Sequence, residues 1–220
     1  IRPGKGSDGL VTADQPKNFY GTSFATTTGG SDATARYIFR NNSPYPVMTA
    51  AEIQFIKAEA LYRKNQKSQA LDAYKKGIEL NIDMLTTDYA TNVPALQQIT
   101  PVAKTTFLAN PVIVPALVDF NLSHIMLQKY IAMYGYGSLE TWVDLRRYHY
   151  LDVETGTTRQ VYTAFEPPAL NELYIDNNQK YIYRTRPRFN SEYLYNIDAL
   201  GQIGALGLDY HTKEQWFSQP

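Results

Sequence analysis

The chain has 220 residues, with 21 lysines and arginines against 21 aspartates and glutamates and a sequence pI near 7.0. This length can bury a sizeable core, but the balanced charge leaves no basic surplus to neutralise a phosphate backbone, so we expect no nucleic-acid partner. The chain contains no cysteine, which excludes disulfides and thiolate metal sites. The 18 tyrosines suit sugar or peptide binding, and they equally suit half-buried packing.

Residues 1–46 are expected to be irregular. Residues 21–35, GTSFATTTGGSDATA, are rich in Gly, Thr and Ser without any period, which indicates a long loop. Tyr20 and Phe24 belong to this region and are our candidate ligand contacts, because binding residues concentrate on loops held by a rigid scaffold. A plain surface loop is the alternative.

Two further features mark this N-terminal region. Residues 35–40, ARYIFR, predict a short strand. The chain opens IRPGKGSDGL, with neither an initiator Met nor the charged and apolar regions of a signal peptide. We therefore expect residues 1–46 to continue from an N-terminal part that the sequence does not include.

The helical pattern begins after residue 46. Thr49 is placed to cap a helix, with Glu52 three residues later as in a capping box. Ile53, Ile56 and Ala60 then predict an apolar stripe, flanked by Phe55 and Leu61. A second amphipathic helix follows after the short connection KNQKS, so the two helices should be antiparallel.

This helix pair has the spacing of a tetratricopeptide-type repeat. Ala58 takes the small position of the first helix, and Ala70, Tyr74 and Gly77 follow at the spacing of the second. Small residues allow the helices to approach closely, while the tyrosine fills the groove between them. One such repeat cannot bury its apolar face alone, so neighbouring helices are expected.

Further helices are predicted at residues 94–98, 101–109 and 116–134, the last apolar over most of its circumference. A Gly-Tyr-Gly sequence ends that helix, and Ser138 can cap the next one, which extends to about Tyr148. Residues 170–189 then alternate between apolar and polar side chains around an Asp-Asn-Asn turn. This alternation predicts a small β-hairpin.

The helix after Ser138 carries the residues that most resemble a catalytic site. Glu140 and Asp144 lie one turn apart, within the range that a glycosidase pair needs, but Arg147 is placed to neutralise Asp144 in a salt-bridged face. Trp142 could be a ligand platform. Its spacing with Leu139, Val143 and Leu145 predicts instead a tryptophan in the core.

Other polar residues give little support for an enzyme. His124, His149 and His211 lack metal-ligand spacing, so neither a metal nor another cofactor is expected. No nucleophile elbow, phosphate-binding glycine loop or zinc-protease motif is present. Arg184, Arg186 and Arg188 alternate along a strand-like stretch, where they could hold an anion or pair with neighbouring carboxylates.

Three segments, taken in order, carry a family resemblance: PVMTAAEIQFIKAEALYRKNQKSQALDAYKKGIEL, LSHIMLQKYIAMYGYGSLETWVDLRRYHY and YRTRPRFNSEYLYN. From Tyr45 to its end, the chain resembles the C-terminal half of SusD/RagB-type nutrient-binding lipoproteins. The resemblance implies a mainly α fold, a tetratricopeptide-like hairpin scaffold with irregular loops and a small β-hairpin. Residues 47–220 would be the C-terminal part of that helical domain.

The resemblance also implies a function. Such proteins sit on the extracellular face of the outer membrane, held by a lipid on an N-terminal cysteine that this sequence does not include. They cap a TonB-dependent outer-membrane transporter and bind oligosaccharides or peptides without cleaving them. No ligand contact carries over residue by residue, because the matching motifs are scaffold. Two alternatives stay open: a tetratricopeptide-like protein-interaction module, and a glycosidase that uses Glu140 and Asp144.

Overall fold

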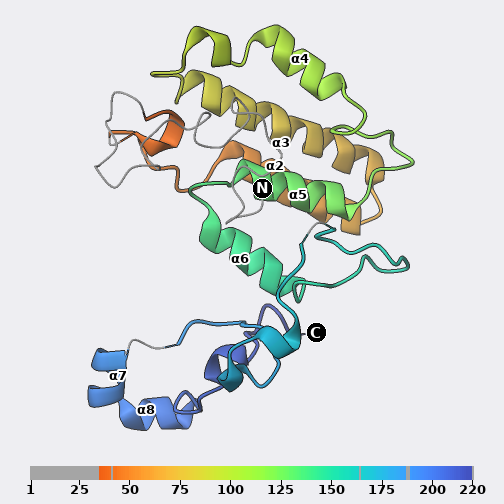
Figure 1. Cartoon of the computed structure of the whole chain (residues 1–220). Helices are drawn as coiled ribbons and strands as arrows, with labels where there is room; N and C mark the ends of the chain where they lie inside the picture. Colours follow the sequence, from red (N-terminus) through yellow and green to blue (C-terminus); the bar gives the residue numbers. More distant parts are fainter. Residues whose placement is uncertain (1–34, 41, 164, 187–188, 220) are drawn as a thin grey trace. The chain divides into compact units, whose positions relative to one another are not determined.

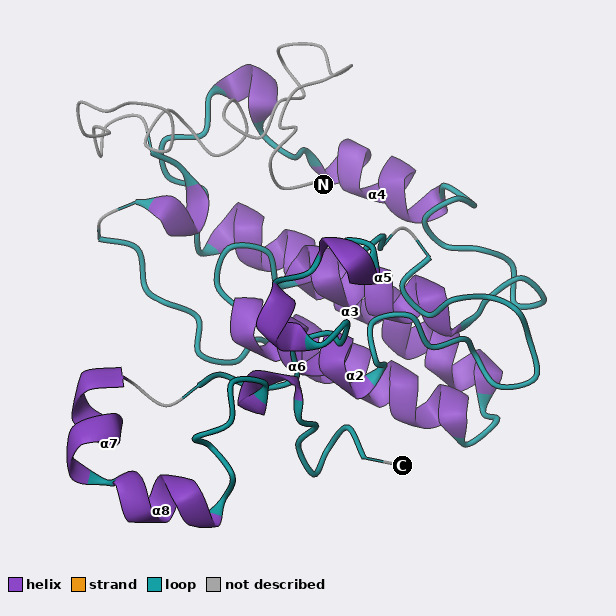
Figure 2. Ribbon diagram, turned by 60° about the horizontal axis from the view of Figure 1, so that its bottom comes forward, coloured by secondary structure: helices purple, strands orange, loops and turns teal. Residues whose placement is uncertain are grey.

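The computed structural model describes residues 35–40, 42–163, 165–186 and 189–219 (Figure 1). All regular elements in these ranges are helices, as Figure 2 shows, apart from one isolated antiparallel bridge between Val153 and Gln160. The predicted mainly α fold class is therefore confirmed. The chain divides into two compact units, one that ends at Ser138 and one that begins at Leu139, and each is described by itself.

The helices of the first unit are α2 (Ala50–Arg63), α3 (Lys67–Thr87), α4 (Pro101–Ala109) and α5 (Leu122–Ala132), with short 3₁₀ turns η3 (Tyr37–Phe39) and η4 (Ala95–Gln97). Helix α6 (Ser138–Arg147) begins at the division between the units. The second unit then contains α7 (Phe189–Tyr195), α8 (Ile197–Gln202) and the 3₁₀ turns η5 (Leu170–Glu172), η6 (Ile175–Asn177) and η7 (Tyr210–Thr212). None of the described helices is both long enough and apolar enough to cross a membrane.

Helices α2 and α3 form the predicted hairpin, and α5 packs beside both of them (Figure 1). The Thr49 hydroxyl accepts the backbone N–H of Glu52 at 3.1 Å, which confirms Thr49 as the N-cap of α2. The chain reverses after α2 at Asn65, whose φ of 59° is left-handed, a conformation that asparagine tolerates better than most residues.

The two helices of the hairpin approach closely where a glycine faces a phenylalanine. A Cβ atom on Gly77 would lie 2.9 Å from Cζ of Phe55, so the aromatic ring occupies the space that a side chain on α3 would need. The Phe55 and Tyr74 rings meet edge to face at 6.2 Å, and Tyr74 lies 5.2 Å from the Phe120 ring. Ala58, Tyr74 and Phe120 are all completely buried. The small residues and the tyrosine of the predicted repeat pattern thus build the core of this unit.

The predicted apolar stripe of α2 is not its buried face. Ile53 is 50 % exposed and Ile56 is 45 % exposed, whereas Ala51, Phe55 and Ala58 are buried. The buried face is rotated around the helix because α3 and α5 pack on the side that carries the small residues and the phenylalanine. The isoleucines therefore lie on a partly exposed apolar face.

Other predicted boundaries are confirmed or corrected. Helix α4 has the predicted bounds, and its N-cap Thr100 accepts the backbone N–H of Ala103 at 3.1 Å. Helix α5 begins at Leu122, six residues later than predicted, because the side chain of Asn121 caps it by accepting the backbone N–H of His124 at 3.3 Å. The strand predicted at residues 35–40 is wrong, since Tyr37–Phe39 is a 3₁₀ turn in which Tyr37 has a positive φ.

The predicted β-hairpin at residues 170–189 is also wrong. Where the structure describes it, this segment has the 3₁₀ turns η5 and η6, and Asn178 is left-handed after the second turn. The backbone N–H groups of Tyr183 and Arg184 both donate to the carbonyl oxygen of His211, at 2.9 and 3.2 Å. The end of the segment therefore bonds to a distant 3₁₀ turn, and no strand is formed where the structure describes it.

We predict that Phe55→Ala lowers the free energy of unfolding by about 3–5 kcal/mol, because it removes a buried ring and leaves a cavity. Ile53→Ala, two residues away on the exposed face of the same helix, should cost less than about 1 kcal/mol. Urea denaturation followed by circular dichroism measures both variants. Equal losses would show that the isoleucine face is as important to this unit as the phenylalanine.

Candidate ligand-binding groove

The charged face of α6 is a structural salt bridge. Asp144 is buried, and its carboxylate oxygen Oδ1 accepts from Nη2 of Arg147 at 2.9 Å, while Glu140 is exposed. A carboxylate that is already ion-paired with a guanidinium is not the free carboxyl group that either member of a glycosidase pair must supply. The geometry therefore supports the salt-bridged interpretation over the glycosidase interpretation.

Trp142 is held by polar partners as well as by packing. The guanidinium carbon of Arg146 lies 3.7 Å from the centroid of its ring, and the indole Nε1–H donates to the Tyr150 hydroxyl at 3.0 Å. The predicted apolar face around it is only partly correct, because Leu145 is buried but Leu139 is 70 % exposed. Trp142 is half-buried and anchors the end of α6, with Arg146 over its ring.

Arg146 connects α6 to two other segments of its unit. Its Nη1 donates to the carbonyl oxygen of Tyr183 at 2.7 Å, and its guanidinium carbon lies 5.0 Å from the ring centroid of Phe217. Burial lowers the pKa of this guanidinium from its usual value, but the group stays charged at any physiological pH. One buried cation thus joins the helix, residues 181–184 and the C-terminal segment.

Arg184 makes a second set of bonds across the same region. Its Nε donates to the carbonyl oxygen of Lys213 at 2.6 Å, its Nη2 donates to the carbonyl oxygen of Glu214, and its Nη1 donates to the Tyr210 hydroxyl at 3.2 Å. Arg186 bonds the Tyr193 hydroxyl at 3.3 Å. These arginines bind carbonyl and tyrosine oxygens, not the carboxylates expected for the row, and Arg188 lies outside the described residues.

The bonds of Arg184 hold together the walls of an open groove of about 850 Å³, which we call the tyrosine groove. One wall comes from residues 179–184 and the other from residues 209–219. The groove is lined by Leu170, Gln179, Lys180, Tyr181, Tyr183, Arg184, Ile203, Asp209, Thr212, Lys213, Glu214 and Gln219. Its volume lies within the range of small-molecule sites in proteins.

The tyrosines of the groove are supported from behind by other aromatic rings. Tyr150 meets Tyr181 and Tyr183 edge to face, with centroids 5.5 and 5.8 Å apart, and stacks on Phe165 at 6.0 Å. The Tyr150 hydroxyl donates to the carbonyl oxygen of Ile182. Burial, the largest cause, and then the charge of Glu214 raise the pKa of Tyr183 to about 12, so its hydroxyl stays neutral and able to donate. The rings are therefore fixed in position before any ligand arrives.

The chemistry of the groove suits a neutral, hydroxyl-rich ligand. Tyrosine combines an apolar ring face with a polar edge, and Lys180, Lys213, Asp209 and Glu214 add donors and acceptors of both charges. A strongly anionic ligand would meet the two carboxylates, and a strongly cationic ligand would meet the lysines. Sugar rings, with apolar C–H faces and hydroxyl edges, match this mixture.

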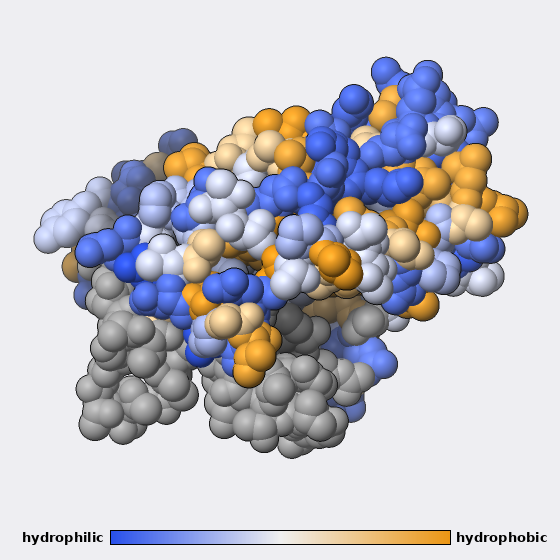
Figure 3. Space-filling view, turned by 90° about the horizontal axis from the view of Figure 1, so that it is seen from above, coloured by the Kyte–Doolittle hydropathy of each residue, from blue (hydrophilic) through white to orange (hydrophobic). Residues whose placement is uncertain are grey.

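The first unit has a different kind of cavity, about 270 Å³ in volume, between α3, α4 and α5. It is lined mainly by apolar side chains, among them Ile78, Ile82, Phe107 and Ile131. The face of the molecule seen in Figure 3 likewise shows separate apolar patches among polar side chains. A cavity with so few polar groups is a poor match for a sugar.

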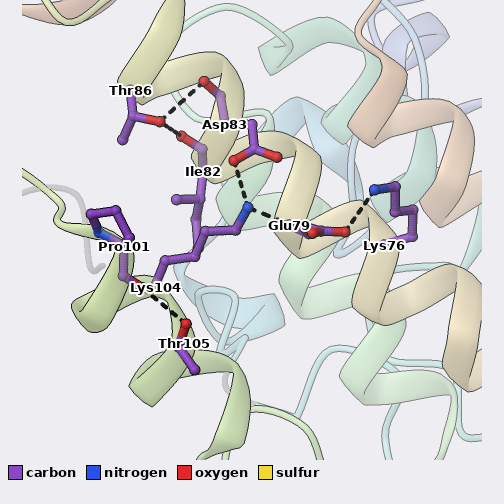
Figure 4. A network of polar contacts seen from close by, with 8 residues as sticks. All are labelled: Lys76, Glu79, Ile82, Asp83, Thr86, Pro101, Lys104 and Thr105. Atoms are coloured by element: carbon purple, nitrogen blue, oxygen red, sulfur yellow. Dashed lines mark hydrogen bonds and ion pairs between the residues drawn. The ribbon is translucent and has the colours of Figure 1, made fainter.

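Lys104 ties α4 to α3 at the edge of this cavity (Figure 4). Its Nζ lies 2.5 Å from Oδ1 of Asp83 and 3.6 Å from Oε1 of Glu79. Lys76 binds the other carboxylate oxygen of Glu79 at 2.7 Å, and this hydrogen bond lowers the pKa of Glu79. Lys104 thus joins α4 to α3, and Lys76 pairs with Glu79 within α3, which makes this cluster structural.

The residues singled out from the sequence are not brought together in one site. Tyr20 and Phe24 lie outside the described residues. Nε2 of His211 is 2.6 Å from Oδ1 of the buried Asn177, while the ring of His124 lies 6.2 Å from that of Phe120 in the other unit. In the part of the chain that the structure describes, no three His, Asp or Glu side chains gather as a metal site.

The groove residues themselves were missed by sequence reasoning. The alternating pattern places Tyr181 and Tyr183 in a β-hairpin. The opposite wall of the groove, at Lys213 and Glu214, lies about thirty residues further along the chain, and no sequence pattern pairs the two segments. The one available signal was the alternation of Tyr181, Tyr183 and the arginines that follow, which indicated an extended segment with one aromatic face.

An open groove lined by tyrosines and by charges of both signs is typical of a ligand-binding site. A family model, SusD-like, described as starch-binding and associating with the outer membrane, matches residues 10–164. The chain therefore belongs to this SusD-like family. Searches of the curated proteins and of the solved structures found no match. The tyrosine groove, at residues 170–219, lies beyond the matched part of the chain.

We predict that Arg184→Ala loosens the walls of the groove, because three bonds from the guanidinium to residues 210–214 are lost. Hydrogen bonds of a charged group contribute about 1.5–3 kcal/mol, so the backbone amides of Tyr183 and Arg184 should exchange with solvent at least about tenfold faster. NMR-detected hydrogen exchange measures this rate. Arg186→Ala, which removes one exposed bond, is the control, and an equal effect in both variants would contradict the assignment.

Proposed function

We propose that this protein captures oligosaccharides at the outer face of the outer membrane and passes them to a TonB-dependent transporter. Membership of a family described as starch-binding and associating with the outer membrane supports the place and the general class of ligand. A lipid on an N-terminal cysteine of the full-length protein would hold it at the membrane. Because the protein would bind the oligosaccharide without cleaving it, its role in uptake would be to deliver the intact ligand to the transporter.

The observation that carries the proposal is the pair Tyr181 and Tyr183 in an open groove with charges of both signs. Their rings are braced by Tyr150, so little conformational freedom is lost when a ligand binds. Two aromatic side chains with hydrogen-bonding groups beside them can hold successive sugar units of a chain. The open form of the groove suits a segment of a longer polymer better than a small enclosed molecule.

Binding without turnover agrees with the polar residues of α6. Asp144 is ion-paired with Arg147, and Glu140 is exposed to solvent on the same helix. Glu140→Gln should therefore leave any hydrolysis background unchanged. Release of reducing sugar from a bound oligosaccharide would contradict the non-catalytic role.

A second function has one observation in its favour. The partly exposed isoleucines Ile53 and Ile56 on α2 offer an apolar face to another helix, as an interaction module of the tetratricopeptide kind would. Such a module needs several stacked repeats, and its ligand would be a protein segment. The binding of peptides in place of glycans would favour this alternative.

The proposal predicts that Tyr181→Ala weakens glycan binding by about tenfold or more, equivalent to roughly 1.4 kcal/mol, because the sugar loses its aromatic contact. Isothermal titration calorimetry against starch oligosaccharides, other neutral glycans and short peptides measures the affinity. Tyr174→Ala removes a tyrosine that is 69 % exposed and outside the groove, and it should bind as the wild type does.

A further variant tests the loop that the sequence favoured. Tyr20→Ala combined with Phe24→Ala should leave binding intact if the groove alone holds the ligand. If this double variant loses binding while Tyr181→Ala keeps it, the tyrosine groove is not the site and the N-terminal loop is.

A further inference from the structure

Each ring nitrogen of His149 lies within hydrogen-bonding distance of an acceptor oxygen. Nδ1 lies 2.7 Å from Oδ2 of Asp152, and Nε2 lies 2.7 Å from the backbone carbonyl oxygen of Ser218. Oε2 of Glu214 is a further 3.5 Å neighbour of Nε2. His149 is held in this position by a left-handed backbone, with φ of 44°, two residues after the end of α6.

This arrangement is complete only when the imidazole is doubly protonated. A neutral imidazole has one N–H, so one of its nitrogens would turn a lone pair toward the carboxylate of Asp152 or the carbonyl of Ser218. The imidazolium donates to both at once, and its positive charge faces Asp152 and Glu214. Loss of the proton therefore removes one hydrogen bond and the attraction to two carboxylates.

The polar neighbours of His149 favour its charged form and outweigh the opposing effect of burial. The hydrogen bond to Asp152 is the largest cause that raises its pKa, burial opposes this, and the Ser218 carbonyl and the charges of Asp152 and Glu214 raise it further. The ring of Tyr183 lies 5.9 Å away, but its pKa of about 12 keeps that hydroxyl neutral. Histidine is the side chain whose ordinary pKa, about 6.5, lies closest to neutral pH.

The C-terminal segment that bonds to His149, residues 214–219, is part of the groove wall. Ser218 is 2 % exposed, and both its backbone N–H and its hydroxyl donate to the carbonyl oxygen of Gln215 at 3.0 Å. Glu214 and Gln219, on either side of this turn, line the tyrosine groove. A bond from His149 to the Ser218 carbonyl therefore fixes the position of one side of the groove.

We propose that His149 is a pH-sensitive latch: its imidazolium clamps residues 214–219 to the end of α6 and sets the shape of the tyrosine groove, and loss of one proton releases that wall. The effect on ligands rests on the proposed function, whereas the latch itself does not. Because its pKa is raised on folding, the clamp is fully present below the unfolded pKa of about 6.5 and is lost as the pH rises through the higher folded pKa. Ligand binding should accordingly weaken on the alkaline side.

The latch is tested on the full chain without any ligand by NMR. The ¹³Cε1 signal of His149 and the backbone amide of Ser218 should titrate together, with a shared midpoint above about 6.5. Asp152→Asn should lower this midpoint, while Asp198→Asn, on the exposed side of α8, should leave it unchanged. In His149→Gln, whose side chain can still donate to the Ser218 carbonyl but does not titrate, the pH dependence of the Ser218 amide should vanish.

Either of two results would overturn the latch: a His149 midpoint at or below about 6.5, or a Ser218 amide that titrates equally in His149→Gln. Its control over the groove is tested separately by calorimetry with starch oligosaccharides at pH 6.0 and pH 8.5. We expect the wild type to bind severalfold more weakly at the higher pH and His149→Gln to bind equally at both. If no oligosaccharide binds at pH 6.0 or at pH 8.5, the proposed function is contradicted. The NMR titration needs no ligand, so it still tests whether His149 acts as a latch.

Discussion

Arg146 places its guanidinium carbon 3.7 Å from the centroid of the Trp142 ring and donates a 2.7 Å hydrogen bond to the carbonyl oxygen of Tyr183. The second unit depends on this interaction, because its described residues contain short helices and no sheet to order them. The same side chain lies against Phe217, so the helix, the tyrosine segment and the C-terminal segment share one anchor. Only a delocalised, forked cation can stack on a ring and donate to a carbonyl in this way.

The two units are stabilised by different kinds of interaction. The first unit relies on close packing of regular helices, in which Gly77 makes room for the ring of Phe55 and Tyr74 fills the space beside it. The second unit relies on side chains that bond to backbone carbonyls, chiefly Arg146 and Arg184. In the second unit, irregular backbone held by these side chains forms the walls of the tyrosine groove.

The sequence predicted the parts of the fold that follow from local rules. The cap at Thr49, the α2–α3 hairpin and the bounds of α4 depend on neighbouring residues, and all were correct. Which face of α2 is buried depends on the helices packed against it, so the exposure of Ile53 could not be foreseen. The groove was missed for the same reason. The backbone N–H of Tyr183 bonds to the carbonyl oxygen of His211, and the alternation of neighbouring side chains does not indicate so distant a partner.

The central claim is that a glycan binds against Tyr181 and Tyr183, and a crystal structure of the protein with its strongest-binding oligosaccharide tests it most directly. We predict a sugar ring lying on the tyrosine wall, with its hydroxyl groups within hydrogen-bonding distance of Lys213 or Glu214. An oligosaccharide bound in the first unit, or against Tyr20 and Phe24, with the tyrosine groove empty, would contradict the account.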